Sequence, residues 1–423
     1  MKETIKVGYV GLGRRGRAVL QHNVAKMKDA EVTILCETYA PWLEEGSKHL
    51  TDAGRPTPKL TADWHDLLKE DLDAVFLMAG WEGRAEMAAA FMEKGVYTGI
   101  EVGCAFDIKE CFDLLEVYER TKTPLMMLEN CCYGRREMMV LSAVKRGLFG
   151  EIVHCDGGYH HDLCGCDLLD QAYRDNHHYR LDSYINRNCE QYPSHELLPL
   201  MKVLGIHRGN RMVSLSSFAS KSRGLRAAAA RMYGPEDKFA NIDYKQGDIV
   251  TTIITCANGE TIHLCLDTTL PRPFYSRNFT VRGTAGMYAE ERKTFYLEGV
   301  TPKEKEAEFN EEEMFKQYDH PLHTEYQEAG GNLGGHDGMD WLVCRAFIEA
   351  AKRGINTPID AYDTIATMAI APLSEKSIAE GGAPQEFPDF TNGKWCDREP
   401  QEPFKYSLDE IIEDRDTPII PEI

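Results

Sequence analysis

The chain has 423 residues, with 48 Lys and Arg against 68 Asp and Glu, so its formal net charge is −20. This length predicts two or three domains with buried cores, and 43% hydrophobic with 27% charged residues exclude a disordered, collagen-like or coiled-coil chain. The acidic excess repels phosphate backbones and anionic lipids, so we expect neither a nucleic-acid nor a membrane partner.

Targeting signals and cysteines indicate the compartment. The N-terminus leads straight into an apolar run, without the basic start and roughly 7 to 15 apolar residues of a secretory signal. No later run approaches the roughly 18 apolar residues that cross a bilayer. The 13 cysteines are scattered and odd in number, which is not the pattern of a disulfide framework. We therefore expect a cytoplasmic protein with reduced thiols.

The first third of the chain alternates short apolar runs with amphipathic stretches, which is typical of a doubly wound parallel sheet. The predicted strands are Ile5 to Val10, Val32 to Glu37, Ala74 to Met78, Tyr97 to Glu101 and Leu125 to Leu128. The predicted helices are Gly16 to Lys28, Arg84 to Lys94, Ile108 to Thr121 and Arg135 to Arg146. The fold class is therefore α/β, beginning with a Rossmann domain over residues 1–130.

Longer strand patterns separated by Gly and Asn-Gly turns follow Gly150. They predict a second α+β domain over residues 131–423 with an open, mainly antiparallel sheet, through which we expect a homo-oligomer. Glu304 to Met314 is predicted to be an exposed acidic segment, and the chain from Glu399 onward to wrap back over the surface. The predicted strands are Ile152 to Tyr159, Arg211 to Ser217, Asp248 to Cys256, Thr261 to Thr268, Phe274 to Gly283 and Gly286 to Glu291.

A glycine-rich turn joins the first predicted strand to the first predicted helix. In Gly11-Leu-Gly13-Arg-Arg-Gly16, Gly11 allows the tight turn, Gly13 the approach of a pyrophosphate and Gly16 close helix packing. Glu37, at the end of the second strand, is the acidic residue expected to hold ribose hydroxyls. A carboxylate there repels a 2′-phosphate and favours NAD over NADP, whereas Arg14 and Arg15 leave NADP open. The alternative is a glycine-rich turn that binds no nucleotide.

The order of the two domains resembles the Gfo/Idh/MocA oxidoreductases, and several motifs more specifically resemble glycoside hydrolase family 109, the NAD-dependent α-N-acetylgalactosaminidase family. The motifs extend over nearly the whole chain. They are Met127-Leu-Glu-Asn-Cys-Cys-Tyr133, Gly147-Leu-Phe-Gly-Glu151, Gly158-Tyr-His-His-Asp-Leu163, Gln191-Tyr-Pro-Ser-His195, Ile206-His-Arg-Gly-Asn210, Gly335-His-Asp-Gly-Met-Asp340 and Pro388-Asp-Phe-Thr-Asn-Gly-Lys-Trp395.

The resemblance implies a set of site residues. Besides the glycine turn, the cofactor contacts would come from Arg14, Arg15, Glu37, Trp81, Arg84, Glu101, Val102 and Asn130. Tyr159, Tyr192 and His195 would be catalytic, and Arg180, Ser194 and Tyr275 would bind the sugar. Such ligands bind in the crevice outside the carboxyl ends of the parallel strands.

The chain also departs from the family pattern. Arg84 stands where the family has histidine, Gly103 where it has proline and Cys164 where it has arginine, while Ser194 replaces threonine and Glu196 replaces glycine. The loop from Leu163 to Arg180 is shorter than in the family. These differences gather near the sugar and leave its identity open. Val102 stands where related dehydrogenases place a lysine, and valine cannot accept a hydroxyl proton.

Three functions remain open at this stage. The first is an NAD-dependent glycosidase that oxidises C3 of the sugar, eliminates the C1 substituent, adds water and reduces C3 again, as the resemblance implies. It needs proton acceptors at two adjacent carbons rather than a carboxylate pair, and Tyr159, Tyr192 and His195 are the candidates. The second is a sugar or polyol dehydrogenase, and the third is a non-catalytic NAD-binding sugar sensor. A turn whose histidine only caps or packs is the structural alternative for Tyr192 to His195.

Clustered histidines and cysteines raise the question of a metal. Neighbouring side chains on a strand point to opposite faces, and no Cys-x-x-Cys pair accompanies the cluster, so a substrate loop is favoured over zinc and we expect no metal. The cluster comprises His160, His161, Asp162, Cys164 and Cys166.

Overall fold

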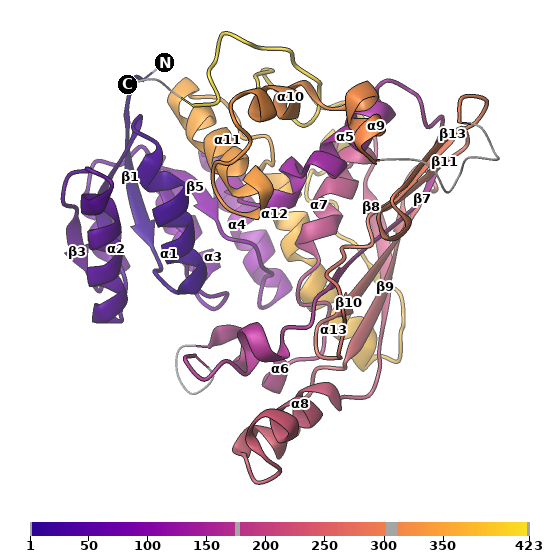
Figure 1. The fold of residues 1–423 in the computed structure, drawn as a ribbon, viewed down its shortest axis with the longest axis horizontal. Coiled ribbons are helices and arrows are strands. Elements are labelled where there is room, and N and C mark those ends of the chain that lie inside the picture. Colours follow the sequence, from indigo (N-terminus) through magenta and orange to yellow (C-terminus); the bar gives the residue numbers. More distant parts are fainter. Residues whose placement is uncertain (1, 174–177, 302–310, 421–423) are drawn as a thin grey trace.

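In the computed structural model, residues 5–127 contain a six-stranded parallel sheet, the left-hand layer of Figure 1. The structure describes residues 2–173, 178–301 and 311–420. The strand order β3-β2-β1-β4-β5-β6 is that of a Rossmann fold, which confirms the predicted fold class. The strands are β1 (Ile5–Val10), β2 (Ala30–Cys36), β3 (Lys59–Thr61), β4 (Ala74–Leu77), β5 (Tyr97–Ile100) and β6 (Leu125–Met127).

The helices beside this sheet follow the sequence pattern with one correction. The predicted helix Gly16 to Lys28 is instead α1 (Arg14–His22) followed by a short 3-10 helix at Val24–Lys26. The break falls at Asn23, a buried residue whose backbone leaves the helical region. The others are α2 (Ala40–Asp52), which was not predicted, α3 (Arg84–Glu93), α4 (Ile108–Thr121) and α5 (Arg135–Lys145).

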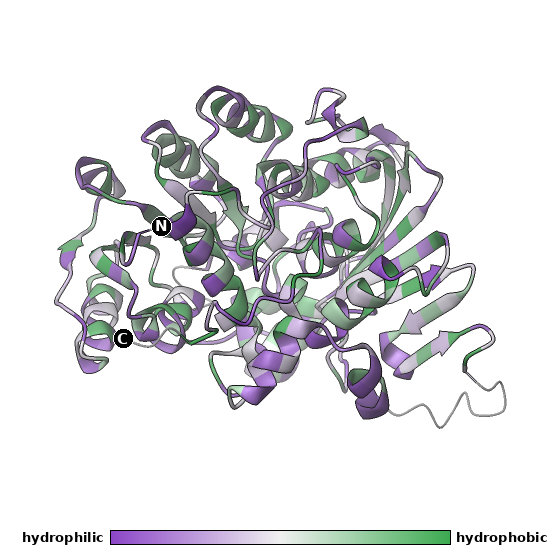
Figure 2. Ribbon diagram, turned by 90° about the horizontal axis from the view of Figure 1, so that it is seen from above, coloured by the Kyte–Doolittle hydropathy of each residue, from purple (hydrophilic) through white to green (hydrophobic). Residues whose placement is uncertain are grey.

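The second sheet has eight strands in the order β13-β12-β11-β7-β10-β9-β8-β14. All pairs are antiparallel except β7 with β10, so the sheet is mixed although mainly antiparallel, as predicted. Strands in Figure 2 alternate between hydrophilic and hydrophobic residues, because one face packs on the core. The strands are β7 (Ile152–His160), β8 (Met212–Ala219), β9 (Ile249–Cys256), β10 (Thr261–Asp267), β11 (Thr280–Gly283), β12 (Gly286–Ala289), β13 (Thr294–Leu297) and β14 (Gln385–Glu386).

The strand predicted from Phe274 to Gly283 is mostly wrong. Only its last four residues form β11, and before them a single bridge joins Ser276 to His160. Pro271 and Pro273 lie just upstream and have no N–H for a ladder, so the chain enters the sheet late.

Helices of the second half connect the two sheets. In Figure 1, α7 and α12 lie between them, and α7 packs on β7 while α12 packs on β6. The helix α11 returns to the first sheet, where Phe347 meets Phe76 edge to face. The division at residue 130 therefore stays a prediction. The helices are α6 (Tyr179–Asn186), α7 (Ser194–Val203), α8 (Gly224–Tyr233), α9 (Glu311–Tyr318), α10 (Pro321–Glu328), α11 (Met339–Arg353), α12 (Ala361–Met368) and α13 (Ile370–Ala379).

The predicted acidic segment Glu304 to Met314 falls mainly outside the described residues, and from residue 311 it is the start of α9. The chain beyond Glu399 returns over the body of the protein, where the Tyr133 hydroxyl donates to the Tyr406 carbonyl at 2.9 Å. None of the described helices has the length and apolar character needed to cross a membrane. The cytoplasmic location stays a prediction.

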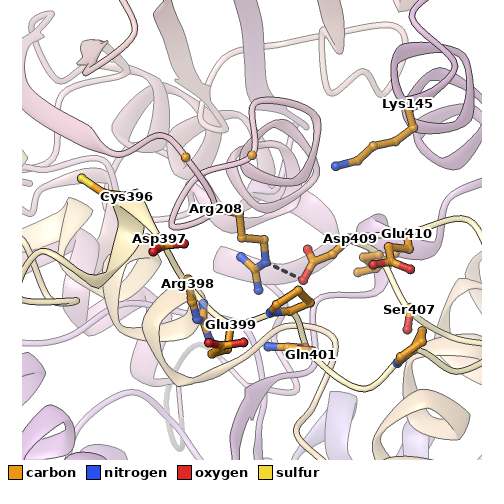
Figure 3. A pocket seen from close by; sticks show the side chains of 15 residues that line it. Lys145, Arg208, Cys396, Asp397, Arg398, Glu399, Gln401, Ser407, Asp409 and Glu410 are labelled. Carbon is orange, nitrogen blue, oxygen red and sulfur yellow. Dashed lines mark hydrogen bonds and ion pairs between the residues drawn. The ribbon is translucent and has the colours of Figure 1, made fainter.

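A buried ion-pair network anchors this returning segment. Asp363, at the start of α12, is fully buried and lies 2.7 Å from Lys202 Nζ and 3.1 Å from Arg208 Nη1. Arg208 also pairs with Asp409 of the returning chain, as the dashed line in Figure 3 marks. The network borders a cavity of about 360 Å³. Asp363 and Asp409 are both paired with cations of the protein, so we assign the charges beside this cavity a structural role.

Candidate active site

A cavity of about 880 Å³ runs along the carboxyl ends of the parallel strands. Glu37 follows β2, Gly11 follows β1, Met78 follows β4, Glu101 follows β5 and Asn130 lies beyond β6, and all five line it. Since these strands are neighbours in that order, the cavity crosses the sheet from one side to the other. Its size is near the upper end of the roughly 300 to 1,000 Å³ typical of small-molecule sites. It therefore has room for more than one small ligand.

The glycine turn lies at one part of this cavity. Gly11 has a φ of +92°, and a Cβ there would lie 2.5 Å from the backbone nitrogen of Ala79. A Cβ on Gly16 would lie 2.1 Å from the Gly11 carbonyl oxygen, so helix and turn touch. A Cβ on Gly13 would meet only Trp42, at 4.0 Å. Gly13 thus leaves its side of the turn open to the cavity, and the geometry fits a bound pyrophosphate.

Glu37 is fixed against the same turn. Its carboxylate accepts hydrogen bonds from the backbone N–H of Leu12 at 2.7 Å and of Tyr39 at 3.0 Å. Arg14 donates to the carbonyl of Cys166, a residue of the short helical turn Cys164–Leu168 that follows β7. The predicted nucleotide side of the cavity is therefore lined by Gly11, Gly13, Arg14, Arg15, Gly16 and Glu37.

Asp340 links several predicted cofactor residues. It receives two hydrogen bonds from Arg15, at 2.7 and 2.8 Å, one from Asn130 at 2.8 Å, and it contacts His336 at 2.9 Å. Burial alone would raise the pKa of Asp340, but the bonds from Arg15 and His336 hold it well below its usual range. Arg15 is thereby committed to a protein carboxylate, and Glu101 lies 3.5 Å from its Nε. Asp340 lies in the first turn of α11, 325 positions from Arg15 in the sequence.

The three predicted catalytic side chains meet at the other end of the cavity. The rings of Tyr159 and Tyr192 stack with centroids 4.5 Å apart, and His195 lies edge-on to both, at 5.3 and 4.8 Å. They come from β7, from the turn before α7 and from α7 itself. Arg180 lies over the Tyr192 ring at 4.9 Å and pairs with Asp167 at 2.6 Å. All four predicted residues line the cavity.

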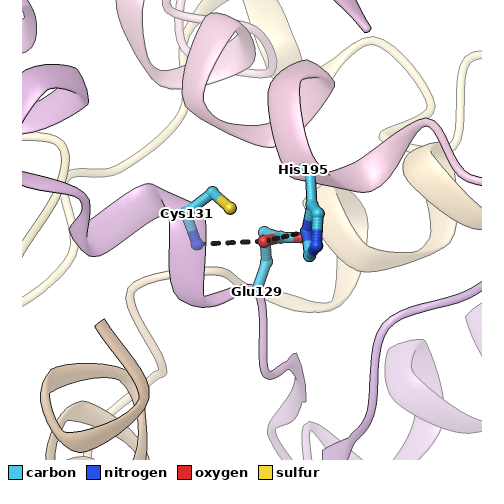
Figure 4. Close-up of side chains that lie close together, drawn as sticks. All are labelled: Glu129, Cys131 and His195. Carbon is cyan, nitrogen blue, oxygen red and sulfur yellow. Dashed lines mark hydrogen bonds and ion pairs between the residues drawn. The ribbon is translucent and has the colours of Figure 1, made fainter. Parts of the chain in front are cut away.

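His195 is oriented by a buried acid that the sequence analysis did not single out (Figure 4). Its Nδ1 lies 2.8 Å from Oε1 of Glu129, which is fully buried. Burial opposes ionisation of Glu129, but the charge and hydrogen bond of His195 outweigh it and lower the pKa of Glu129. The pair leaves Nε2 of His195 as the ring nitrogen without a partner among the described residues. This arrangement suits proton transfer at Nε2.

Both tyrosines favour their neutral forms. Burial raises the pKa of Tyr159 and of Tyr192, and the nearby charge of Arg180 offsets this only in part. The Tyr159 hydroxyl lies 3.1 Å from Nδ1 of His161, which also lines the cavity. Tyr159 and Tyr192 were candidates for proton acceptors, but the charge of Arg180 does not overcome the effect of burial on either of them. The two tyrosines are therefore suited to donate hydrogen bonds to a ligand, and His195 is suited to accept a proton from it.

Four predicted site residues do not line the cavity. Ser194 is fully buried, and Tyr275 is about half exposed and contacts the His161 ring at 5.1 Å. Trp81 and Arg84 both donate to the carbonyl of Val102, at 3.3 and 3.2 Å, from behind the cavity wall.

Four residues of the site were not predicted from the sequence, namely Glu129, His161, Asp167 and Asp340. A carboxylate after a parallel strand was a usable signal for Glu129.

The suspected metal cluster does not converge. Asp162 accepts the Cys164 N–H, the Cys164 thiol faces the Thr269 carbonyl, and His160 lies 3.5 Å from Glu291. Among the described residues, Glu129, Cys131 and His195 are the group close enough to share an ion. Glu129 Oε1 is already occupied by His195 and by the Cys131 N–H at 3.0 Å. The carboxylate thus serves hydrogen bonding in this arrangement.

Glu190 lies two positions before Tyr192 in the sequence, and we expect it to make the folding stability of the protein depend on pH. It is 1% exposed, and burial raises its pKa from 4.5 to about 8. The folded state therefore binds one more proton than the unfolded state between these values, and stability falls as pH rises through that window. We expect Glu190→Gln to flatten this dependence and to be more stable than the parent at pH 9 by on the order of 3 kcal/mol.

Urea unfolding of both proteins at pH 5 and pH 9 measures this difference. The two should have similar stability at pH 5, where Glu190 is neutral in the folded state. An equal loss of stability in both proteins between the two pH values would contradict the assignment.

Comparison with known proteins gives sequence and structural relatives. Residues 133–397 match the model of the glycosyl hydrolase 109 C-terminal domain. A glycosyl hydrolase family 109 protein of Stenotrophomonas maltophilia (strain K279a) is 38% identical over 418 residues, covering 94% of this chain and 91% of that protein. An alpha-N-acetylgalactosaminidase of Tannerella forsythia is 37% identical over 423 residues, with 94% and 88% coverage.

Solved structures resemble the fold as a whole. Levoglucosan dehydrogenase in complex with NADH superposes with a TM-score of 0.66 at 15% identity, covering 91% of this chain and 99% of that chain. An apo scyllo-inositol dehydrogenase from Lactobacillus casei gives 0.62 at 13% identity, with 92% and 99% coverage. These likenesses show that the chain shares the two-sheet fold of these dehydrogenases.

Proposed function

The chain belongs to glycosyl hydrolase family 109, and from this premise we propose that it hydrolyses a small glycoside with NAD as a cofactor that is regenerated in each turnover. The observation that carries the proposal is the meeting of His195, Tyr159 and Tyr192 with the glycine turn in one cavity. The Tannerella relative bears the name alpha-N-acetylgalactosaminidase. An α-linked N-acetylgalactosaminide is therefore the first substrate to test.

The nucleotide side of the cavity suits NAD. Gly11, Gly13 and Gly16 would cradle its pyrophosphate, and Glu37 would accept hydrogen bonds from ribose hydroxyls while repelling a 2′-phosphate. The nicotinamide would then reach Glu101, Val102 and Asn130, beyond the next strands of the sheet. Bound there, NAD supplies the chemistry that proton transfer alone lacks, by taking a hydride from C3 of the sugar and returning it.

The residues of the chain would handle the protons. His195, held by Glu129, would remove the C2 proton that the C3 ketone acidifies. Tyr159 would take the proton of the C3 hydroxyl as it passes its own proton to Nδ1 of His161, which lies 3.1 Å away. Loss of the C2 proton breaks the C1–O bond, and a neutral tyrosine can donate the proton that the leaving group needs. Water then returns a hydroxyl to C1 and a proton to C2, and C3 is reduced, so atoms and electrons balance as a hydrolysis. Val102 lines the cavity where a dehydrogenase lysine would stand, which favours this route over net oxidation.

A second copy of the chain is part of the proposal. Phe218 and Ile253 lie on the same outward face of the second sheet, 58% and 40% exposed, and a partner sheet would cover them. Light scattering on the purified protein tests this association.

The elimination route predicts label at C2. In heavy water, cleavage of p-nitrophenyl N-acetyl-α-galactosaminide should place deuterium at C2 of the released sugar, because that proton leaves and returns in each turnover. Direct displacement at C1 would leave C2 untouched. Thioglycosides should also be cleaved, since elimination depends less on protonating the leaving group. Absorbance at two wavelengths follows nitrophenolate and NADH, and mass spectrometry or NMR reads the label.

The outcomes separate the three functions. Nitrophenolate without accumulating NADH, with deuterium at C2, supports the glycosidase. Accumulating NADH without nitrophenolate selects a net dehydrogenase. Neither signal across a panel of glycosides and free sugars, with NAD bound, selects a sensor.

A further inference from the structure

Arg84 is a buried cation with few partners. Its side chain is 2% exposed, and its only hydrogen bond among the described residues runs from Nη1 to the Val102 carbonyl at 3.2 Å. Nε and Nη2 are buried without a partner, and no described carboxylate forms an ion pair with it. Burial lowers the pKa of Arg84, yet a guanidinium stays charged in proteins. A charge buried in this way is costly unless the site uses it.

The space for this guanidinium is made by a glycine. Gly103 has a φ of +146°, and a Cβ there would lie 2.1 Å from Trp81 Nε1 and 2.6 Å from Arg84 Nη2. Trp81 shares the Val102 carbonyl with Arg84, donating to it at 3.3 Å. The absence of a side chain at position 103 therefore lets the guanidinium and the indole both reach one backbone oxygen.

This oxygen belongs to the wall of the cavity. Glu101 and Val102 follow β5 directly and line the cavity. The neighbouring strand β4 is followed by Ala79, which contacts the glycine turn and lines the same cavity. The other charges of this wall are largely paired, since Arg15 is bound by Asp340 and lies 3.5 Å from Glu101. Val102 thus separates Arg84 from the surface that the nicotinamide would contact, and no described carboxylate pairs with Arg84.

We propose that Arg84 is a positioning residue that favours the reduced cofactor, because its fixed positive charge lies behind the wall against which the nicotinamide would bind. The inference rests on the proposed function. Hydride transfer from sugar to NAD⁺ removes the positive charge of the ring, so a nearby cation destabilises the oxidised form and not the reduced one. The first step of the cycle, oxidation at C3, becomes more favourable. The carbonyl of Val102 holds the charge in place.

The test is the ratio of the dissociation constants of NAD⁺ and NADH, measured by calorimetry or by NADH fluorescence without any sugar. We expect Arg84→Met to tighten NAD⁺ relative to NADH by about tenfold, which corresponds to a fall of about 30 mV in the potential of the bound couple. Arg84→Lys keeps a charge and should restore most of the ratio. Gly13→Val, which fills the open side of the turn, should abolish binding of both forms.

A matched control is Arg187→Met. Arg187 is also largely buried, but it pairs with Glu375 at 2.6 Å, so its removal should leave the ratio unchanged. A structural role of Arg84 would weaken both forms alike in Arg84→Met and leave the ratio at the parental value, and that result overturns the inference while the proposed function stands. A parent protein that binds neither NAD⁺ nor NADH overturns both. Thermal unfolding of each variant confirms that the binding data come from folded protein.

Discussion

Replacement of His195 by alanine is expected to lower glycoside turnover by about 10²- to 10⁴-fold, the usual contribution of a positioned acid–base group. The ring lies edge-on to Tyr159 and Tyr192 in the cavity, and its Nδ1 is held 2.8 Å from Glu129. The loss should fall on kcat, with binding of NAD⁺ unchanged, because no predicted nucleotide contact involves this side chain. Incorporation of deuterium at C2 should fall in parallel.

Glu129→Gln tests how the histidine is held. The amide oxygen can still accept from Nδ1, so the ring stays in place, but the negative charge is lost. We expect a loss of turnover smaller than that of His195→Ala, because the ring keeps its place while the carboxylate charge beside it is lost. Turnover equal to that of the parent would show that the carboxylate serves packing alone.

The variant His195→Asn is a control for loss of activity through misfolding. Asparagine is polar and close in size to the inner part of the ring, so this variant should keep the thermal stability of the parent while losing activity. Wild-type turnover in either histidine variant would remove His195 from the mechanism.

Replacement of Asp363 by alanine is expected to cost about 3 to 5 kcal/mol of folding stability. The carboxylate is fully buried between Lys202, His207 and Arg208, at 2.7, 2.9 and 3.1 Å. Burial opposes its ionisation, yet the two stronger cations hold the pKa of Asp363 well below its usual range. Alanine would leave Lys202, itself 2% exposed, without its closest acid. Urea unfolding at pH 7 measures the change.

Asp113→Ala is the matched control. Asp113 pairs with Lys109 one helical turn away, but both side chains are more than half exposed, at 52% and 76%. Water screens such a pair, and its loss should change stability by no more than about 0.5 kcal/mol. Equal effects of the two substitutions would show that the network around Asp363 does not anchor the returning chain.

Local patterns in the sequence determined the first sheet of this protein and its glycine turn. Gly11, Gly13 and Gly16 sit within six residues, and the alternation of apolar runs predicts β1, β2, β4, β5 and β6 to within about two residues. The helix α4 begins and ends as predicted, because Asp107 caps it and its buried face has helical spacing. Each of these features depends on steric limits and hydrogen bonds between near neighbours in the chain, which the sequence displays directly.

The family resemblance brought the residues Tyr159, Tyr192 and His195 together, and their spacing alone would not have done so. It also included Ser194 and Tyr275 among the contacts, whereas the structure places both outside the cavity lining. The mixed second sheet shows the same limit. Neither β7 nor β10 reveals by its own alternation that the two run parallel, because strand direction is set by the path of the chain between them.

Only the tertiary structure decided the pairs that complete the site. Glu129 and His195 are 66 positions apart, and Arg15 and Asp340 are 325 apart. Arg84 acquired its buried position from the space at Gly103, and Asp363 acquired its cations from α7 and from the chain just after it, which carries His207 and Arg208. Such contacts arise from how whole elements pack, and a buried charge is stabilised where a partner from another element reaches it. The sequence lists the residues, and burial after folding sets which of them interact.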